Sequence, residues 1–194
     1  MKSTSEMIAR TLFTIVFAFF GMSAYAQSQS SGILETIVRN FYKNEKIIVK
    51  GRQQLLFLYC GKANNNEEIF ETLQDLKLPA DVVRKIRSQV KSDVNPENWQ
   101  AELDAIYAKD DTKIRQKIND CLSVEQYQEQ RSRLNLNNQR LMIVSKPILF
   151  QNGTKALVKV AFYRNIEHNN GSVLLMENTA SGWIIKDQLN SWST

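Results

Sequence analysis

The last third of the chain constrains its fold most, because apolar side chains alternate there with a period of two. Through residues 155–164, Ala156, Val158, Val160 and Phe162 interleave with Leu157, Lys159, Ala161 and Tyr163. Such alternation predicts a strand. Apolar runs at 141–144, 148–150, 172–177 and 183–188 predict further strands. They are separated by Asn152-Gly153, Asn170-Gly171 and Ser181-Gly182, of which Asn-Gly provides the positive φ angles that hairpin turns require. The sequence therefore predicts an antiparallel meander of about four strands over residues 140–192.

The preceding part, about residues 30–134, has the spacing of short amphipathic helices. The clearest stripe consists of Ile33, Leu34, Ile37, Val38, Phe41 and Tyr42, for which Ser30 or Ser31 is the predicted cap. Further helix starts are predicted at Glu67, Pro79, Asn95-Pro96, Asp110 and the Ser123/Gln126 capping box. The helix from Asp110 is expected to include Cys121 and Leu122 on its apolar face. The apolar runs in residues 46–60 do not decide between strand and helix.

Helices followed by a meander define an α+β protein. We expect the N-terminal set of short helices to pack as one layer on the C-terminal sheet. The chain has no Pro/Gly/Ser-rich linker between the two parts. Residues 27–194 are therefore predicted to form a single domain.

The first 26 residues have the pattern of a secretory signal. Lys2 and Arg10 precede an apolar run from Leu12 to Phe20, and the segment ends in Ala24-Tyr25-Ala26. The run is shorter than the roughly 20 apolar residues that a membrane span needs. We expect cleavage between Ala26 and Gln27, export to the periplasm or the exterior, and no stable span in the mature protein. The alternative is an uncleaved N-terminal anchor.

Cys60 and Cys121 are the two cysteines of the chain. Export would place them where disulfides form and persist, so an intramolecular bridge is the natural hypothesis. Two separate buried thiols are the alternative, because both residues belong to apolar stretches. Two cysteines and one histidine do not provide a structural zinc site of the usual four-ligand kind, and we expect no metal.

The formal net charge of +5 raises the question of nucleic-acid binding. That function requires basic residues gathered on one face. Basic and acidic residues are instead spread almost evenly along the chain. We therefore expect no nucleic-acid partner, and interpret the positive balance as solvated surface.

Patterns typical of catalysis are scarce. The single histidine, His168, lies in the predicted turn Glu167–Gly171 and is expected to be an exposed hairpin residue. Glu67, Glu68 and Glu71, and likewise Asp110 and Asp111, fall at predicted helix starts, where the helix dipole favours negative charge. The chain has no Gly-x-Ser-x-Gly elbow and no glycine-rich phosphate loop. No catalytic residue, cofactor or metal ligand is assigned from the sequence.

Aromatic residues in the strand region offer a different hypothesis. Phe162, Tyr163, Trp183 and Trp192 could line the concave face of a curved sheet and hold an apolar ligand or a partner. Packing in the core is the alternative interpretation.

Residues 141–194 also carry a family resemblance. The stretch from Lys146-Pro147-Ile148 through Ala156-Leu157-Val158 to Gly182-Trp183-Ile184-Ile185 resembles the closing strands of small exported bacterial proteins of unassigned function. It is also similar to the last strands of the nuclear transport factor-like α+β cone. The second resemblance implies a pocket between helices and a curved sheet. The acid/base dyad of the catalytic cone members has no match here, so no functional residue is carried over.

These features favour an exported, non-catalytic binding protein of the bacterial cell envelope. Its partner would be a protein or a small ligand, and an immunity or inhibitor protein would fit the size and export. One alternative is a small enzyme of the cone type, with carboxylates and aromatics in its pocket. The other is a structural or assembly protein of the envelope, which would have a large self-association surface.

Overall fold

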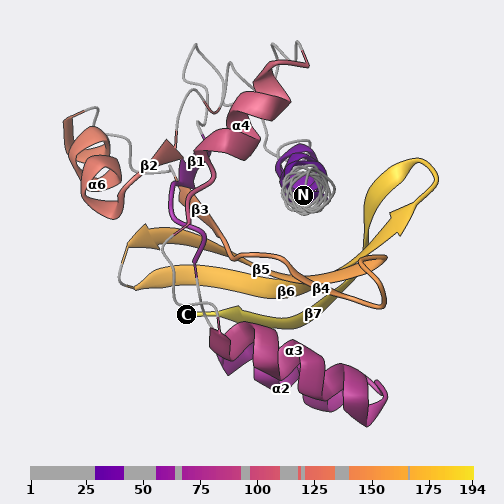
Figure 1. Cartoon of the computed structure of the whole chain (residues 1–194). Coiled ribbons are helices and arrows are strands. Elements are labelled where there is room, and N and C mark those ends of the chain that lie inside the picture. Colours follow the sequence, from indigo (N-terminus) through magenta and orange to yellow (C-terminus); the bar gives the residue numbers. More distant parts are fainter. Residues whose placement is uncertain are drawn as a thin grey trace, which may run out of the picture.

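The computed structural model describes residues 29–41, 56–63, 67–92, 97–109, 118, 121–133, 140–165 and 167–194. Its strands are β1 (Leu56–Tyr59), β2 (Cys121–Leu122), β3 (Arg140–Val144), β4 (Ile148–Phe150), β5 (Lys155–Asn165), β6 (His168–Thr179) and β7 (Gly182–Ser193). Its helices are residues 29–41, α2 (Glu67–Asp75), α3 (Ala80–Ser92), α4 (Gln100–Tyr107) and α6 (Val124–Arg133). The strands form one sheet in the order β2-β1-β3-β5-β6-β7, with β4 paired to β5 (Figure 1).

The strands after residue 140 form the predicted antiparallel meander. β3, β5, β6 and β7 are successive antiparallel neighbours, and β4 pairs antiparallel with the first part of β5. β1 extends this meander in the parallel direction, with Leu58 opposite Met142 of β3. The α+β fold class is therefore confirmed, and Leu56–Tyr59 is a strand within the segment that the spacing left undecided.

β2 corrects the prediction that Cys121 and Leu122 belong to a helix. Cys121 pairs with Leu58 and Leu122 with Tyr59, both in parallel register. The apolar spacing fits a helix equally well, and pairing with β1, about 60 residues away in the chain, decides the outcome. Both side chains are buried. The other residues predicted for that helix, apart from Ile118, lie outside the described residues.

The hairpin turns agree with two of the three turn predictions. Asn152 and Gly153 lie in the β4–β5 turn with φ of 57° and 77°, and Gly182 follows the β6–β7 turn with φ of 105°. Asn170-Gly171 was predicted as a turn but lies inside β6, since β5 and β6 are already paired at Asn165 and His168. Gly171 is needed there for another reason, because an added Cβ would overlap the Trp192 ring.

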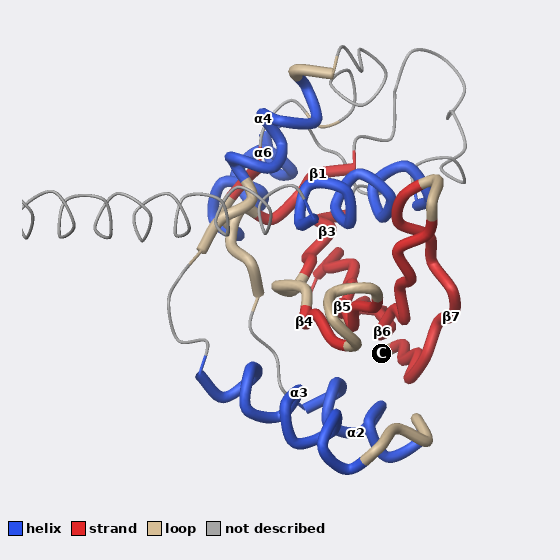
Figure 2. Tube along the Cα trace, turned by 45° about the vertical axis from the view of Figure 1, so that its right-hand side comes forward, coloured by secondary structure: helices blue, strands red, loops and turns tan. Residues whose placement is uncertain are grey.

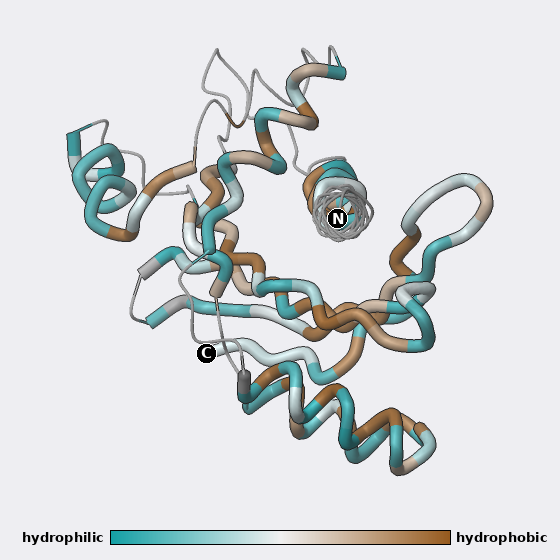
Figure 3. Tube along the Cα trace, in the orientation of Figure 1, coloured by the Kyte–Doolittle hydropathy of each residue, from teal (hydrophilic) through white to brown (hydrophobic). Residues whose placement is uncertain are grey.

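Helices cover both faces of the sheet, where the sequence predicted one layer. Residues 29–41 and α4 lie on one face, and α2 and α3 lie on the other (Figures 1 and 2). Alternation along β5 explains this, since Val158 belongs to the core on the first face and Leu157 to the core on the second. The first core includes Ile33, Ile37, Leu103, Ile106, Met142 and Leu174. The second includes Ile69, Leu73, Ile86, Val90, Ile148 and Val173. Figure 3 shows hydrophobic stretches through the middle of the sheet and mixed polar and apolar turns in α2 and α3.

Helix starts depend on capping. The predicted capping box at α6 is confirmed, because Gln126 N donates to Ser123 Oγ (3.2 Å) and Ser123 N donates to Gln126 Oε1 (2.8 Å). The expected start at Asn95-Pro96 was placed too early, since Asn98 bridges Gly61 in an antiparallel pair. α4 begins at Gln100, whose N–H donates to Asn98 Oδ1 (3.1 Å).

The described part of the N-terminal region begins inside a helix. Ser30 and Ser31 lie within helical residues 29–41, so neither caps the start of a helix at Ile33. The signal segment, with Ala26 and Gln27, lies outside the described residues. Within the described part of the chain, no helix has the length and apolar character to cross a membrane.

Candidate functional site

Among the described residues, the largest group of paired charged side chains lies where the chain leaves β1. Residues 60–62 pair there with residues 97–99, through Lys62 N to Glu97 O and Trp99 N to Cys60 O, both 2.9 Å. This short pairing precedes α4 directly. It places the side chain of Lys62 beside those of Glu97, Trp99 and Glu102, and we call these residues, together with Lys146, the Lys62 cluster.

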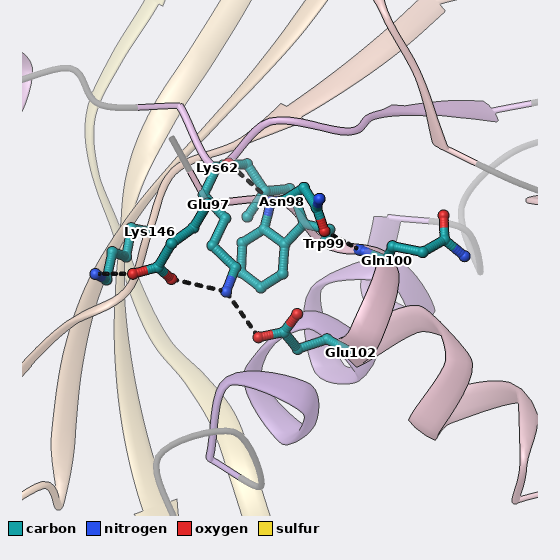
Figure 4. Close-up of polar contacts among 8 residues, drawn as sticks. Lys62, Glu97, Asn98, Trp99, Gln100, Glu102 and Lys146 are labelled. Carbon is teal, nitrogen blue, oxygen red and sulfur yellow. Dashed lines mark hydrogen bonds and ion pairs between the residues drawn. The ribbon is translucent and has the colours of Figure 1, made fainter. Parts of the chain in front are cut away.

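Lys62 is the centre of the cluster. Its Nζ donates to Glu102 Oε1 at 2.7 Å and to Glu97 Oε2 at 3.1 Å (Figure 4). The side chains of Lys62 and Glu102 are only 8% and 4% exposed, whereas that of Glu97 is 42% exposed. Lys146 donates to Glu97 Oε1 at 2.5 Å from the solvent side. Two ammonium groups and two carboxylates thus balance, with the inner pair removed from water.

Trp99 anchors the cluster to the sheet. Its buried indole donates from Nε1 to Val144 O of β3 at 3.1 Å. Lys62 Nζ lies 4.9 Å from the centroid of the ring, within the range of a cation–π interaction. The indole therefore contributes packing, a hydrogen bond to the sheet and a favourable contact for the buried ammonium.

The carboxylates of the cluster differ in their electrostatics. Burial raises the pKa of Glu97, but the hydrogen bonds and charges of Lys146 and Lys62 together lower it by more. The pKa of Glu97 therefore lies below its ordinary value. Glu102 keeps one buried oxygen, Oε2, without a hydrogen-bond partner. The geometry joins α4 to the sheet, and it also brings a carboxylate oxygen and an ammonium group together beside an aromatic ring.

A second polar group lies on the opposite face and uses acidic residues that the sequence singled out. Glu68 of α2 accepts from Lys159 Nζ of β5 at 2.5 Å. Glu71 accepts from Asn190 Nδ2 of β7 at 2.9 Å. Lys159 Nζ also lies 5.0 Å from the Trp192 ring. These contacts fasten the first turns of α2 to the sheet, so Glu68 and Glu71 act as links between elements.

An open depression of about 650 Å³ runs along α3. Among the described residues it is lined by one face of that helix, which we call the α3 stripe: Ala80, Val83, Arg84, Arg87, Ser88 and Lys91. The adjoining side of α3 carries Ile86 and Val90 into the second core, and Val83, at the boundary between the two sides, packs partly against the same core. The charged members of the stripe, Arg84, Arg87 and Lys91, lie beside this packed side and are exposed.

The α3 stripe is cationic and exposed. Arg84, Arg87 and Lys91 are all exposed, and in the described part of the chain no ion pair involves them. Arg87 lies over the Phe70 ring at 5.8 Å, which supports its side chain and leaves its charge in place. The stripe can accept negative groups without first losing internal partners.

The aromatic residues proposed for a concave pocket do not converge. Phe162 is buried on the first face against Phe41, with ring centroids 5.0 Å apart, whereas Tyr163 packs against Tyr127 at 6.0 Å near α6. Trp183 packs on the first core, and Trp192 lies across Gly171. Their packing against neighbouring elements favours the core interpretation.

The cysteines, the histidine and the remaining acidic residues belong to neither the Lys62 cluster nor the α3 stripe. Cys60 and Cys121 lie at disulfide distance, with Cα atoms 4.6 Å apart. His168 is the first residue of β6, at the β5–β6 hairpin. Asp110 and Asp111 lie outside the described residues. The described residues contain no group of three or more His, Cys, Asp and Glu side chains suited to a metal ion.

The sequence missed the Lys62 cluster. Its members come from three separated segments, around residues 62, 97–102 and 146, and no local pattern joins them. The α3 stripe did have a signal, because an amphipathic helix from Pro79 places Arg84 and Arg87 on its outer side. No local pattern indicates the depression itself.

Comparison with known proteins assigns no family to this architecture. No protein-family model matches the chain, and no match was found among curated proteins or solved structures.

Proposed function

We propose that this chain is an exported, non-catalytic binding protein of the bacterial cell envelope, and that it acts by holding a protein or small-ligand partner. An immunity or inhibitor protein is one form that this function could take. The observation that carries the proposal is the α3 stripe, in which exposed cations without an ion-pair partner among the described residues line an open depression. Export rests on the signal pattern that ends at Ala26.

The contrast between charged groups supports binding over catalysis. In the Lys62 cluster each ammonium group faces a carboxylate, which stabilises the fold. The charges on α3 have no such partners among the described residues, so their field extends into solvent, where it steers oppositely charged molecules.

One observation favours a second candidate, the small enzyme of the cone type. Glu102 Oε2 is buried without a hydrogen-bond partner, and it belongs to a carboxylate that lies beside Lys62 and Trp99. A buried polar atom without a partner requires an explanation, and a catalytic role is one of them. A substrate of this enzyme would have to reach the inner side of α4.

The test is capture followed by reconstitution. The tagged protein, purified as the cell processes it, is incubated with envelope extract, and bound proteins and small molecules are identified by mass spectrometry, with heat-denatured bait as the control. We expect one enriched partner, whose purified form binds the protein in calorimetry at a fixed stoichiometry. Turnover of an envelope substrate, abolished by Glu102→Gln and without any recovered partner, would instead establish the enzyme.

The same material tests export. We expect the exported protein to begin at Gln27, and N-terminal sequencing measures this directly. An intact Met1 on the exported form would overturn cleavage and favour the N-terminal anchor.

A further inference from the structure

We propose that the α3 stripe binds an acidic segment of a protein partner, with carboxylates facing Arg84, Arg87 and Lys91 and a small apolar contact at Ala80 and Val83. This inference rests on the proposed binding function and names the surface and the chemistry of its partner.

The spacing of the stripe residues favours a single binding surface. From residue 80 to residue 91, each of them has another stripe residue three or four positions away, which places them on one face of a helix. At a rise of about 1.5 Å per residue, the stripe is about 17 Å long, or three helical turns. A partner segment of similar length can therefore contact all of it at once.

The charges of the stripe favour an acidic partner. Arg84 and Arg87 are three positions apart, and Arg87 and Lys91 are four apart, so the cations repel one another along the helix. Asp81 and Lys91 are the acidic and basic residues at the two ends of α3, in the favourable order for the helix dipole. Asp81 lies three positions before Arg84, but no acidic residue of α3 lies beside Arg87 and Lys91. Carboxylates from outside would remove the repulsion, and arginine can hold a carboxylate through two parallel hydrogen bonds.

The small apolar residues of the stripe favour a protein segment over a membrane surface. The apolar members of the stripe are Ala80 and Val83, which are small, and none of the stripe residues is aromatic. Helices that lie on membranes carry large residues such as Trp, Phe and Leu on the inserted face.

The experiment uses a defined probe. A fluorescein-labelled helical 15-residue peptide carries leucine near one end and glutamates spaced four and three positions apart, and a second peptide has glutamine in their place. Binding to the protein, purified as the cell processes it, is measured by fluorescence anisotropy. We expect the glutamate peptide to bind about tenfold more tightly than the glutamine peptide, with an advantage that shrinks as salt is added.

Matched variants locate the binding. Arg84→Gln/Arg87→Gln removes two charges from the stripe, and Lys77→Gln/Lys85→Gln removes two exposed charges that do not line the depression. We expect about a tenfold loss of affinity for the glutamate peptide in the first variant and less than about a twofold loss in the second. Circular dichroism confirms that both variants fold.

Four outcomes would overturn the inference. Equal binding of the two peptides would remove the role of carboxylates, and equal losses in the two variants would show nonspecific attraction. Tighter binding to phosphatidylglycerol vesicles than to the glutamate peptide, lost in the stripe variant alone, would assign the surface to lipid. If the envelope partner binds both double variants equally well, the binding function stands and the assignment to α3 fails.

Discussion

The basic side chains of the Lys62 cluster and of the α3 stripe lie in opposite environments. Lys62 is almost removed from water, and two carboxylates and an indole ring surround its ammonium group. Arg84 and Arg87 are exposed, and no carboxylate of the described residues pairs with them. The first group joins α4 to the sheet, while the second lies on a helix that its apolar side already holds in place.

This difference explains why basic residues contribute to stability in one region and to binding in the other. A buried ion pair has lost its hydration, so each partner depends on the other. An exposed charge keeps its hydration and contributes little to stability. Substitutions in the Lys62 cluster should therefore lower the free energy of unfolding, whereas substitutions in the α3 stripe should change binding alone.

The largest effect is expected for Lys62→Ala. It leaves the carboxylate of Glu102 buried without its cation and removes the contact with Trp99. Breaking a buried pair from one side costs about 3–5 kcal/mol of unfolding free energy. Urea denaturation followed by circular dichroism measures it.

The control replaces both members of that pair. Lys62→Met/Glu102→Leu has apolar side chains of similar volume, and we expect it to recover most of the lost stability because no charge remains buried. A single variant as stable as the parent would mean that solvent reaches the pair, and the contrast between the two regions would disappear.

The next effect concerns Cys60 and Cys121, which lie at disulfide distance, directly after β1 and at the start of β2. We expect a bridge that closes a loop across 61 positions and stabilises the fold by about 2–4 kcal/mol. Cys60→Ser/Cys121→Ser in the urea assay measures this contribution. Thiol labelling of the unreduced, denatured protein should find no free cysteine, and two reactive thiols would contradict the bridge.

Local patterns explain how much of this could be predicted. The meander could be predicted from the alternation in residues 155–164 and from the glycines at 153 and 182. Strand alternation and tight turns both depend on residues that are neighbours in the sequence. Cys121 was assigned to a helix since its spacing fits one, and only β1 at a distance makes it a strand. Asn170-Gly171 was assigned to a turn, whereas Trp192 requires the glycine within β6.

The candidate sites follow the same rule. Arg84 and Arg87 could be placed on an outer helix face from sequence, because that face is set by a period of 3.6 residues. Lys62 and Glu102 are 40 positions apart, and their pairing depends on the short bridge between Gly61 and Asn98. No sequence pattern within either segment predicts such a bridge.

A smaller effect is expected from pH at Glu97. Its pKa is lowered in the folded state, where hydrogen bonds from Lys146 and Lys62 outweigh the effect of burial. A lowered pKa contributes stability above the unfolded value, and this contribution is lost as the pH falls through the folded value. We expect the stability difference between the parent and Glu97→Gln to be constant from pH 7 to about 5 and to shrink below about 4.5. A difference that persists at pH 2.5 would contradict the charge pairing.

The smallest effect is expected for Arg84→Gln. It removes repulsion from Arg87 and also attraction to Asp81 one turn earlier, and each such pair contributes about 0.2–0.5 kcal/mol. The two terms oppose each other, so the unfolding free energy should change by less than about 0.5 kcal/mol in the same urea assay. A loss above about 1.5 kcal/mol, the level of a charged hydrogen bond within a fold, would mean that Arg84 is paired inside the protein. Its charge would then not be available to a partner, and α3 would belong with the Lys62 cluster as part of the internal scaffold.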